Sequence, residues 1–181
     1  MDDIILYMAN NKWQDDLKGD RKRFLLNLAK ESSAESNIAS KIGSMLISNQ
    51  LLEECLKDIV EYSVYYIKAE IWPADVDLSF DFSKSTFGEL IRSFKRFAMI
   101  EFNRDIILEY LTKYNKKRND VVHHLFGIEN ISALSAELDE YAIIAEEIFY
   151  LLLEYDNCSC EKFCDLSNRV DFKDFLDFIE D

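Results

Sequence analysis

One run of residues, from Arg118 to His124, combines side chains that can bind and transform a phosphodiester. It holds the guanidinium of Arg118, the amide of Asn119 and the imidazoles of His123 and His124, which are the only histidines of the chain. Arginine offers a permanent charge and several N–H donors to a phosphate. Histidine titrates near neutral pH and can act as a general acid or base. The run therefore predicts a site suited to phosphodiester cleavage.

Arg118 interrupts an apolar stripe. At helical spacing the stripe consists of Ile107, Leu111, Tyr114, Val121 and Leu125, and Arg118 occupies the missing position between the third and fourth members. Burying an unpaired charge costs several kcal/mol. The arginine therefore needs a partner, a water-filled cleft or a protein interface. An alternative stays open, in which Arg118 pairs with a buried acid and the histidines are ordinary helix-end residues.

The polar neighbours of Arg118 are also ordered along the predicted helix. Asn119 and His123 are four residues apart and share one flank, whereas His124 lies on the opposite flank. The lysines of the same segment make it locally basic, and we expect them to bind substrate phosphates: Lys113, Lys116 and Lys117.

The elements that must position this run are helices. The 181 residues include one proline and four glycines, too few for the many tight turns of a sheet protein. Apolar spacing and capping residues predict helices over 2–17, 21–30, 36–70, 103–126, from Ser132 to about 156, and near 170–179, and another that Ser85 or Thr86 caps. Residues 31–36 read as a loop, and 74–85 as an extended loop or one short strand. Asn49 is expected to be a hydrogen-bonded amide in the core.

The length fits one domain. We divide it into N-terminal helices over 1–35, a helical bundle over 36–156, and an acidic C-terminal segment over 157–181 that packs on the same domain. The fold class predicted from these elements is an all-α bundle of about four to six helices.

The charge distribution limits the kinds of partner. The net charge is −14, and residues 127–181 contribute 15 acidic against 3 basic residues. An acidic total argues against a protein that coats nucleic acid non-specifically, but it permits a local cationic site. We expect the acidic tail to aid solubility; the alternative is that it covers the basic site or binds a basic partner. No membrane span or secretion signal is recognised, and the reducing cytoplasm is the expected compartment.

Three cysteines lie close together near the C-terminus. Cys158, Cys160 and Cys164 fall within seven residues, which we place in a loop. A structural zinc site usually needs four ligands in recognisable pairs, and no fourth cysteine is near. We therefore predict no metal site and no cofactor.

The motif Arg118-Asn119-x3-His123 resembles the R-x4-6-H motif of the HEPN superfamily, including a polar residue directly after the arginine. The motif lies late in a helix, between two long helices, and the segment 86–91 (TFGELI) is also similar to members of this group. The resemblance covers roughly residues 36–155. It implies a HEPN-like bundle with long antiparallel core helices.

The resemblance also implies an activity and a partner. HEPN domains usually dimerise so that two motifs meet, and many are metal-independent endoribonucleases of toxin–antitoxin pairs or antiviral defence. Carried over to this chain, Arg118 holds the scissile phosphate of RNA and His123 is the general base or acid. Asn119 orients His123 or the phosphate. His124, at a spacing of six, is the competing motif histidine. Some HEPN proteins carry a tyrosine two residues after the histidine that a partner modifies, and here this position is Leu125.

A second interpretation also remains. Some members of the superfamily are inactive and serve only as interaction modules, so the chain is either an endoribonuclease or a non-catalytic helical module that binds a protein. A cytoplasmic homodimer with a cognate antitoxin or defence partner is expected in the first case.

Overall fold

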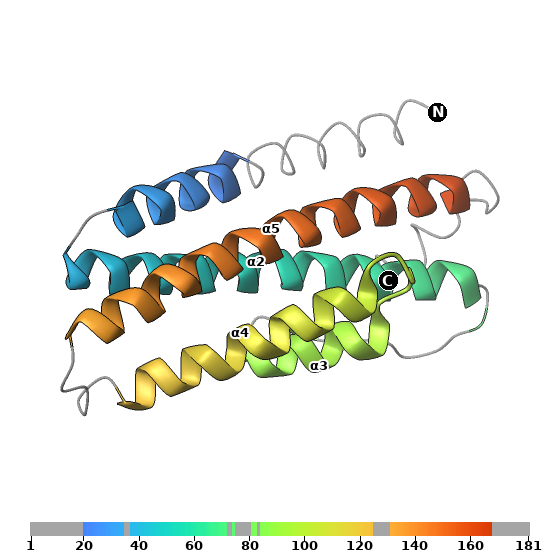
Figure 1. The fold of residues 1–181 in the computed structure, drawn as a ribbon. Coiled ribbons are helices and arrows are strands. Elements are labelled where there is room, and N and C mark those ends of the chain that lie inside the picture. Colours follow the sequence, from blue (N-terminus) through green and yellow to red (C-terminus); the bar gives the residue numbers. More distant parts are fainter. Residues whose placement is uncertain are drawn as a thin grey trace.

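The computed structural model describes residues 20–34, 37–71, 74, 81–82, 84–124 and 131–167. Within these ranges the regular structure is entirely helical: residues 20–34, α2 (Ile38–Ile71), α3 (Phe87–Phe97), α4 (Arg104–His124) and α5 (Ile131–Ser167) (Figure 1). The all-α class is therefore confirmed. Among the helices described, none has a stretch long and apolar enough to cross a membrane.

The two longest helices, α2 and α5, lie side by side along the bundle and form its largest interface (Figure 1). They run in the same direction. Lys41 near the start of α2 bonds to Asp139 near the start of α5, and Cys55 further along α2 lies within the electrostatic influence of Asp156. The expectation of antiparallel core helices is thus wrong for this pair. Helix α3 runs in the same direction as both, since Phe87 at its start contacts Tyr114 and Phe94 further along contacts Tyr155 of α5. Helix α4 then runs back to the starting end before α5 begins.

Helix α4 supplies the antiparallel partner that was expected. It runs against α5, since Tyr114 stacks on Tyr141 and Lys117, one turn later in α4, pairs with Glu140, one residue earlier in α5. Helix α3 packs against α2 and lies beside α4 (Figure 1). The C-terminal half of α4, where the predicted site begins, therefore faces the N-terminal part of α5.

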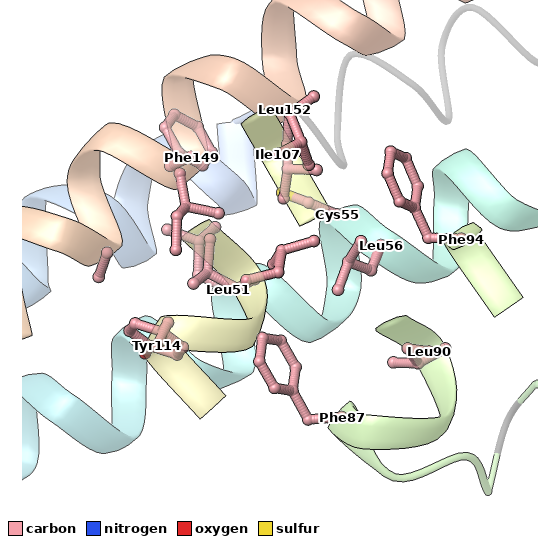
Figure 2. Close-up of a cluster of buried hydrophobic side chains, with 14 of the residues drawn as sticks. Leu51, Cys55, Leu56, Phe87, Leu90, Phe94, Ile107, Tyr114, Phe149 and Leu152 are labelled. Atoms are coloured by element: carbon pink, nitrogen blue, oxygen red, sulfur yellow. The ribbon is translucent and has the colours of Figure 1, made fainter. Parts of the chain in front are cut away.

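One hydrophobic core joins the four labelled helices (Figure 2). Fully buried side chains come from each of them: Leu52 and Leu56, Phe87 and Phe94, Ile107 and Leu111, and Ile148 and Leu152. Burying one such side chain contributes about 1.5–3 kcal/mol. Edge-on aromatic contacts of Phe87 with Tyr114 and of Phe94 with Tyr155 fix α3 against its neighbours.

The start of α3 follows the capping residue that the sequence indicated. Thr86 is the N-cap; its Oγ1 accepts from the backbone N–H of Glu89, and the Glu89 carboxylate accepts from the Thr86 N–H. This reciprocal arrangement satisfies two amides that a helix start leaves unpaired. The prediction of a cap at Ser85 or Thr86 is confirmed for Thr86.

Three predicted helix boundaries are wrong. Residues 31–34 are helical where a loop was expected, and Ser132 lies inside α5, which begins at Ile131. The expected loop with three cysteines is instead the last part of α5, which continues to Ser167. No proline or glycine interrupts this part, and Cys158 extends the stripe that packs on the core.

Residues 20–34 are attached to the bundle mainly through charged pairs. Arg21 bonds to Glu54 at 2.8 Å and Lys22 to Asp58 at 2.7 Å, both on α2, and Lys30 bonds to Glu146 on α5 at 2.6 Å. Buried Ala29 and half-buried Leu25 and Leu26 complete the contact. The predicted helices at 2–17 and near 170–179, and most of 74–85, lie outside the described residues.

Candidate functional site

The predicted site residues occupy the C-terminal half of α4. Lys113, Lys116 and Asn119 are exposed, whereas Lys117 and Arg118 are half-buried. Tyr114 and Val121, which flank Arg118 in the apolar stripe, are buried. Arg118 therefore lies on the core-facing side of α4, but its side chain is only half-buried.

The two histidines belong to the last turn of α4 by backbone conformation. Their side chains lie outside the described residues. The choice between His123 and His124 as the motif histidine therefore stays a prediction, as does the catalytic role of either one.

Tyrosine rings from two helices meet beside Arg118. Tyr114 of α4 and Tyr141 of α5 are buried, and their ring centroids lie 4.2 Å apart at an interplanar angle of 35°. The two hydroxyls are neighbours, but neither has a hydrogen-bond partner of ordinary length and angle among the described residues. A buried polar group without a partner costs about 1–3 kcal/mol.

Helix α2 adds two polar residues to the same place. Asn49 donates from Nδ2 to Oε1 of Glu53, one turn later, at 3.0 Å. The carbonyl oxygen of Asn49 is buried and, within the described residues, has no hydrogen-bond partner. The prediction of a hydrogen-bonded core amide is therefore confirmed for one of its two polar atoms.

The pKa values of the tyrosines show that these groups share one electrostatic environment. Burial raises the pKa of Tyr114 well above its usual value, neighbouring Tyr141 raises it further, and the positive charge of Arg118 opposes both. Burial likewise raises the pKa of Tyr141, and Arg118 opposes it. Glu53 raises both pKa values. Both phenols are thus neutral at physiological pH, near one cation and one carboxylate.

We call the group of Asn49, Glu53, Tyr114, Arg118 and Tyr141 the polar cluster. It joins α2, α4 and α5 within an otherwise apolar core. Glu53 is the acid whose charge reaches the same tyrosines as Arg118, but among the described residues Arg118 forms no ion pair within 4.0 Å. The sequence-based alternative of an arginine paired with a buried acid is therefore not what the described residues show.

The three lysines of the site differ in what they contact. Lys117 forms an ion pair with Glu140 of α5, and this bond lowers the pKa of the Glu140 carboxyl, with a smaller contribution from Lys113. Lys117 therefore links α4 to α5. Lys113 and Lys116 are exposed beside Asn119, so they are the better placed of the predicted substrate-binding lysines.

A surface pocket of about 260 Å³ lies elsewhere, between residues 20–34, α2 and α5. Its charged walls include Lys30 and Glu146, which bond to each other, and Asp139, which bonds to Lys41. None of the residues lining it belongs to the polar cluster. The charged side chains that line the pocket are thus already engaged in ion pairs within the protein.

The prediction of no metal site was made from the cysteines. Within the described part of the chain, no three side chains of His, Cys, Asp or Glu gather as a metal site would require. Cys158 is half-buried and Cys160 exposed on α5, two positions apart on a helix and hence on different sides of it. The Cys164 side chain lies outside the described residues.

The tyrosines and the α2 residues of the polar cluster were not predicted as parts of a site. Tyr114 and Tyr141 were recognised only as members of apolar stripes, and Asn49 only as a core amide. The available signal was the pair Asn49 and Glu53, four apart beside the seam of α2. This pair gains meaning only once Glu53 is known to act on the same tyrosines as Arg118.

Comparisons with known proteins add no further constraint: no protein-family profile, no curated protein and no solved structure matches the chain.

Proposed function

We propose that the chain is a HEPN-like, metal-independent endoribonuclease that acts as a toxin or antiviral defence effector. The proposal combines the R-x4-6-H resemblance of Arg118 and His123 with an all-helical bundle in which this motif ends α4. Exposed Lys113 and Lys116 provide cationic contacts for the RNA backbone.

One observation carries the proposal. Arg118 is a half-buried guanidinium that has no ion pair among the described residues, five residues before His123 on the same helix. A cation in a partly dry site that no carboxylate neutralises favours an anionic ligand. A phosphodiester supplies the missing charge and can bind the guanidinium through two oxygens.

The proposed reaction begins with the 2′-hydroxyl of RNA. One imidazole removes its proton while the oxygen attacks phosphorus, and the bond from phosphorus to the 5′-oxygen breaks. Arg118 stabilises the charge that develops on the phosphoryl oxygens. The leaving oxygen takes a proton from an imidazolium, and the products are a 2′,3′-cyclic phosphate and a 5′-hydroxyl. His123 or His124 supplies these proton transfers.

We further propose that two copies meet through the motif face of α4, so that two arginines and their histidines form one site. Val122, on the turn of the histidines, is an apolar side chain that is 46% exposed, and this exposure suits an interface. A cognate antitoxin or defence partner would bind over this face.

The test is cleavage of end-labelled RNA in EDTA by the purified parent protein and by Arg118→Ala, His123→Ala and His124→Ala. We expect cleavage by the parent, a loss of at least about a hundredfold in Arg118→Ala and a similar loss in one histidine variant. Arg92→Ala, which removes an exposed arginine of α3, is the matched control and should cleave as the parent does. Cleavage that survives substitution of both histidines would overturn the proposal.

A non-catalytic interaction module is the second candidate. The observation that favours it is that Lys117 is engaged with Glu140 while apolar Ile106 and Val122 of α4 are 48% and 46% exposed. In this case the folded parent cleaves no RNA tested. The variant Val122→Glu should then abolish partner binding without changing stability.

A further inference from the structure

The polar cluster offers acceptors that match the donors of Arg118. A guanidinium has five N–H donors, and a phosphate bound through two oxygens occupies two of them. Three donors remain for groups of the protein. Three buried oxygens of the cluster have no hydrogen-bond partner of ordinary length and angle among the described residues: Oδ1 of Asn49 and the hydroxyls of Tyr114 and Tyr141.

These three oxygens come from three helices. Asn49 belongs to α2, Tyr114 to α4 and Tyr141 to α5, and the charge of Arg118 acts on both phenols. The bond from Nδ2 of Asn49 to Glu53 directs the amide nitrogen to the carboxylate and leaves the amide oxygen as an acceptor. Glu53 raises the pKa of both tyrosines, so its carboxylate belongs to the same electrostatic environment as Arg118.

A structural tyrosine in the same bundle has a different environment. Tyr155 of α5 is fully buried, and its hydroxyl accepts a hydrogen bond from the backbone N–H of Ile100 at 3.1 Å. That hydroxyl satisfies a buried amide of the fold. The hydroxyls of Tyr114 and Tyr141 satisfy no such group in the described residues, and phenylalanine rings would fill the same space.

We propose that Asn49, Tyr114 and Tyr141 are positioning residues for Arg118. Their oxygens accept from its inward N–H groups, directly or through a buried water, and leave the outer edge of the guanidinium free to hold the phosphodiester. This inference rests on the proposed ribonuclease function for its effect on catalysis, but the positioning of Arg118 can be measured without RNA.

The first test measures stability and cleavage in Tyr114→Phe and Tyr141→Phe, with Tyr155→Phe as the matched control. The two cluster variants should unfold close to the temperature of the parent, because Arg118 is half-buried and an N–H group that loses its hydroxyl acceptor can turn to water. Tyr155→Phe should unfold at a lower temperature, because it leaves the Ile100 amide without its partner. In cleavage, kcat should fall about ten- to a hundredfold in the cluster variants with KM little changed.

Dependence on Arg118 separates positioning from a general effect on the fold. In an Arg118→Lys background the same tyrosine substitutions should cause no further loss of kcat. Lysine lacks the planar guanidinium whose N–H groups the tyrosine hydroxyls position. Full kcat in both tyrosine variants, with Arg118→Ala inactive, would overturn the positioning role and leave the proposed function intact.

A second measurement does not require cleavage. The Nε–H resonance of Arg118, assigned by its loss in Arg118→Lys, should exchange with solvent more slowly in the parent than in the double variant Tyr114→Phe/Tyr141→Phe. Equal exchange would overturn the inference whatever the activity. Slow exchange in a parent that cleaves no RNA would support the positioning of Arg118 and refute the ribonuclease proposal.

Discussion

At the scale of single residues, Cys55 shows how strongly position controls reactivity. Its thiol is 5% exposed on α2, and burial raises its pKa to about 12, with nearby Lys22 acting in the opposite direction and too weakly to reverse it. Thiolate is the reactive form of cysteine. Cys55 is therefore present as the inert thiol throughout the physiological pH range.

Labelling with a thiol-specific disulfide reagent tests this prediction. At pH 8 we expect Cys55 of the folded protein to react at least about a hundredfold more slowly than exposed Cys160 on α5, and to react fully once the chain is unfolded in urea. Mass spectrometry of the labelled peptides assigns each site, and Cys160→Ser is the control for the fast phase. Equal labelling rates in the folded protein would contradict the burial of Cys55.

The sequence predicted the position of Arg118 within its own helix and nothing about its neighbours from other helices. Periodicity placed Arg118 on the apolar side of α4, and the structure finds it half-buried between Tyr114 and Val121. The groups that share its electrostatic environment come partly from α2 and α5, and Glu53 and Tyr141 lie 65 and 23 positions away in the chain. Spacing within one helix contains no information about which faces of other helices meet it.

At the scale of elements, helix starts were more predictable than helix ends. The start of α3 rests on the chemistry of two side chains, Thr86 and Glu89, which the sequence displays directly. How far α5 continues depends instead on tertiary packing, because residues such as Cys158 contact the core only in the folded bundle. A polar segment without glycine or proline can continue or stop, and packing decides which occurs.

Removing the cap of α3 should destabilise the bundle. Thr86→Ala deletes the hydroxyl that accepts from the Glu89 amide, and we expect a loss of about 1 kcal/mol in the free energy of unfolding measured in urea. Thr112→Ala is the matched control, since this hydroxyl only bonds back to the Leu108 carbonyl within exposed α4. Alanine is the better helix former there, so stability should stay the same or rise slightly. Equal losses in both variants would argue against the cap.

At the scale of the whole molecule, the order of the helices was predicted and their directions were not. The sequence indicates four of the five described helices at nearly their observed positions, with α5 the least accurate. Long helices with short connections favour antiparallel neighbours. Here α3 runs in the same direction as α2 and only α4 runs back, so the two longest helices pack in parallel. That choice depends on how all apolar faces close together, which no single segment specifies.

The attachment of residues 20–34 to this bundle yields a prediction about the whole molecule. The side chains of Lys22 and Asp58 are each only 17% exposed. Burial lowers the pKa of Lys22, but the bond to Asp58 and the other acidic groups nearby outweigh this effect, and the pKa is raised. Lys22→Gln removes one partner of this half-buried pair and should cost roughly 1–3 kcal/mol of unfolding free energy.

Arg23→Gln is the matched control for that experiment. Arg23 is adjacent, 81% exposed, and reaches only Asp20 at 4.0 Å, so its loss should leave the urea midpoint unchanged. Hydrogen exchange should also show faster opening of residues 20–34 in Lys22→Gln than in the control. An unchanged midpoint and exchange pattern in Lys22→Gln would mean that apolar contacts alone hold this helix.

The parallel packing of α2 and α5 has a consequence for synthesis on the ribosome. The contact between Lys41 and Asp139 spans 98 residues, so the main interface cannot form until α5 has been synthesised. Contacts that are so distant in sequence slow folding relative to bundles built from neighbouring helices. Arg118 emerges before Tyr141, and for that interval the arginine has only the residues of earlier helices around it. The polar cluster is therefore assembled only after Tyr141 has been made, and until then the newborn chain has no finished site.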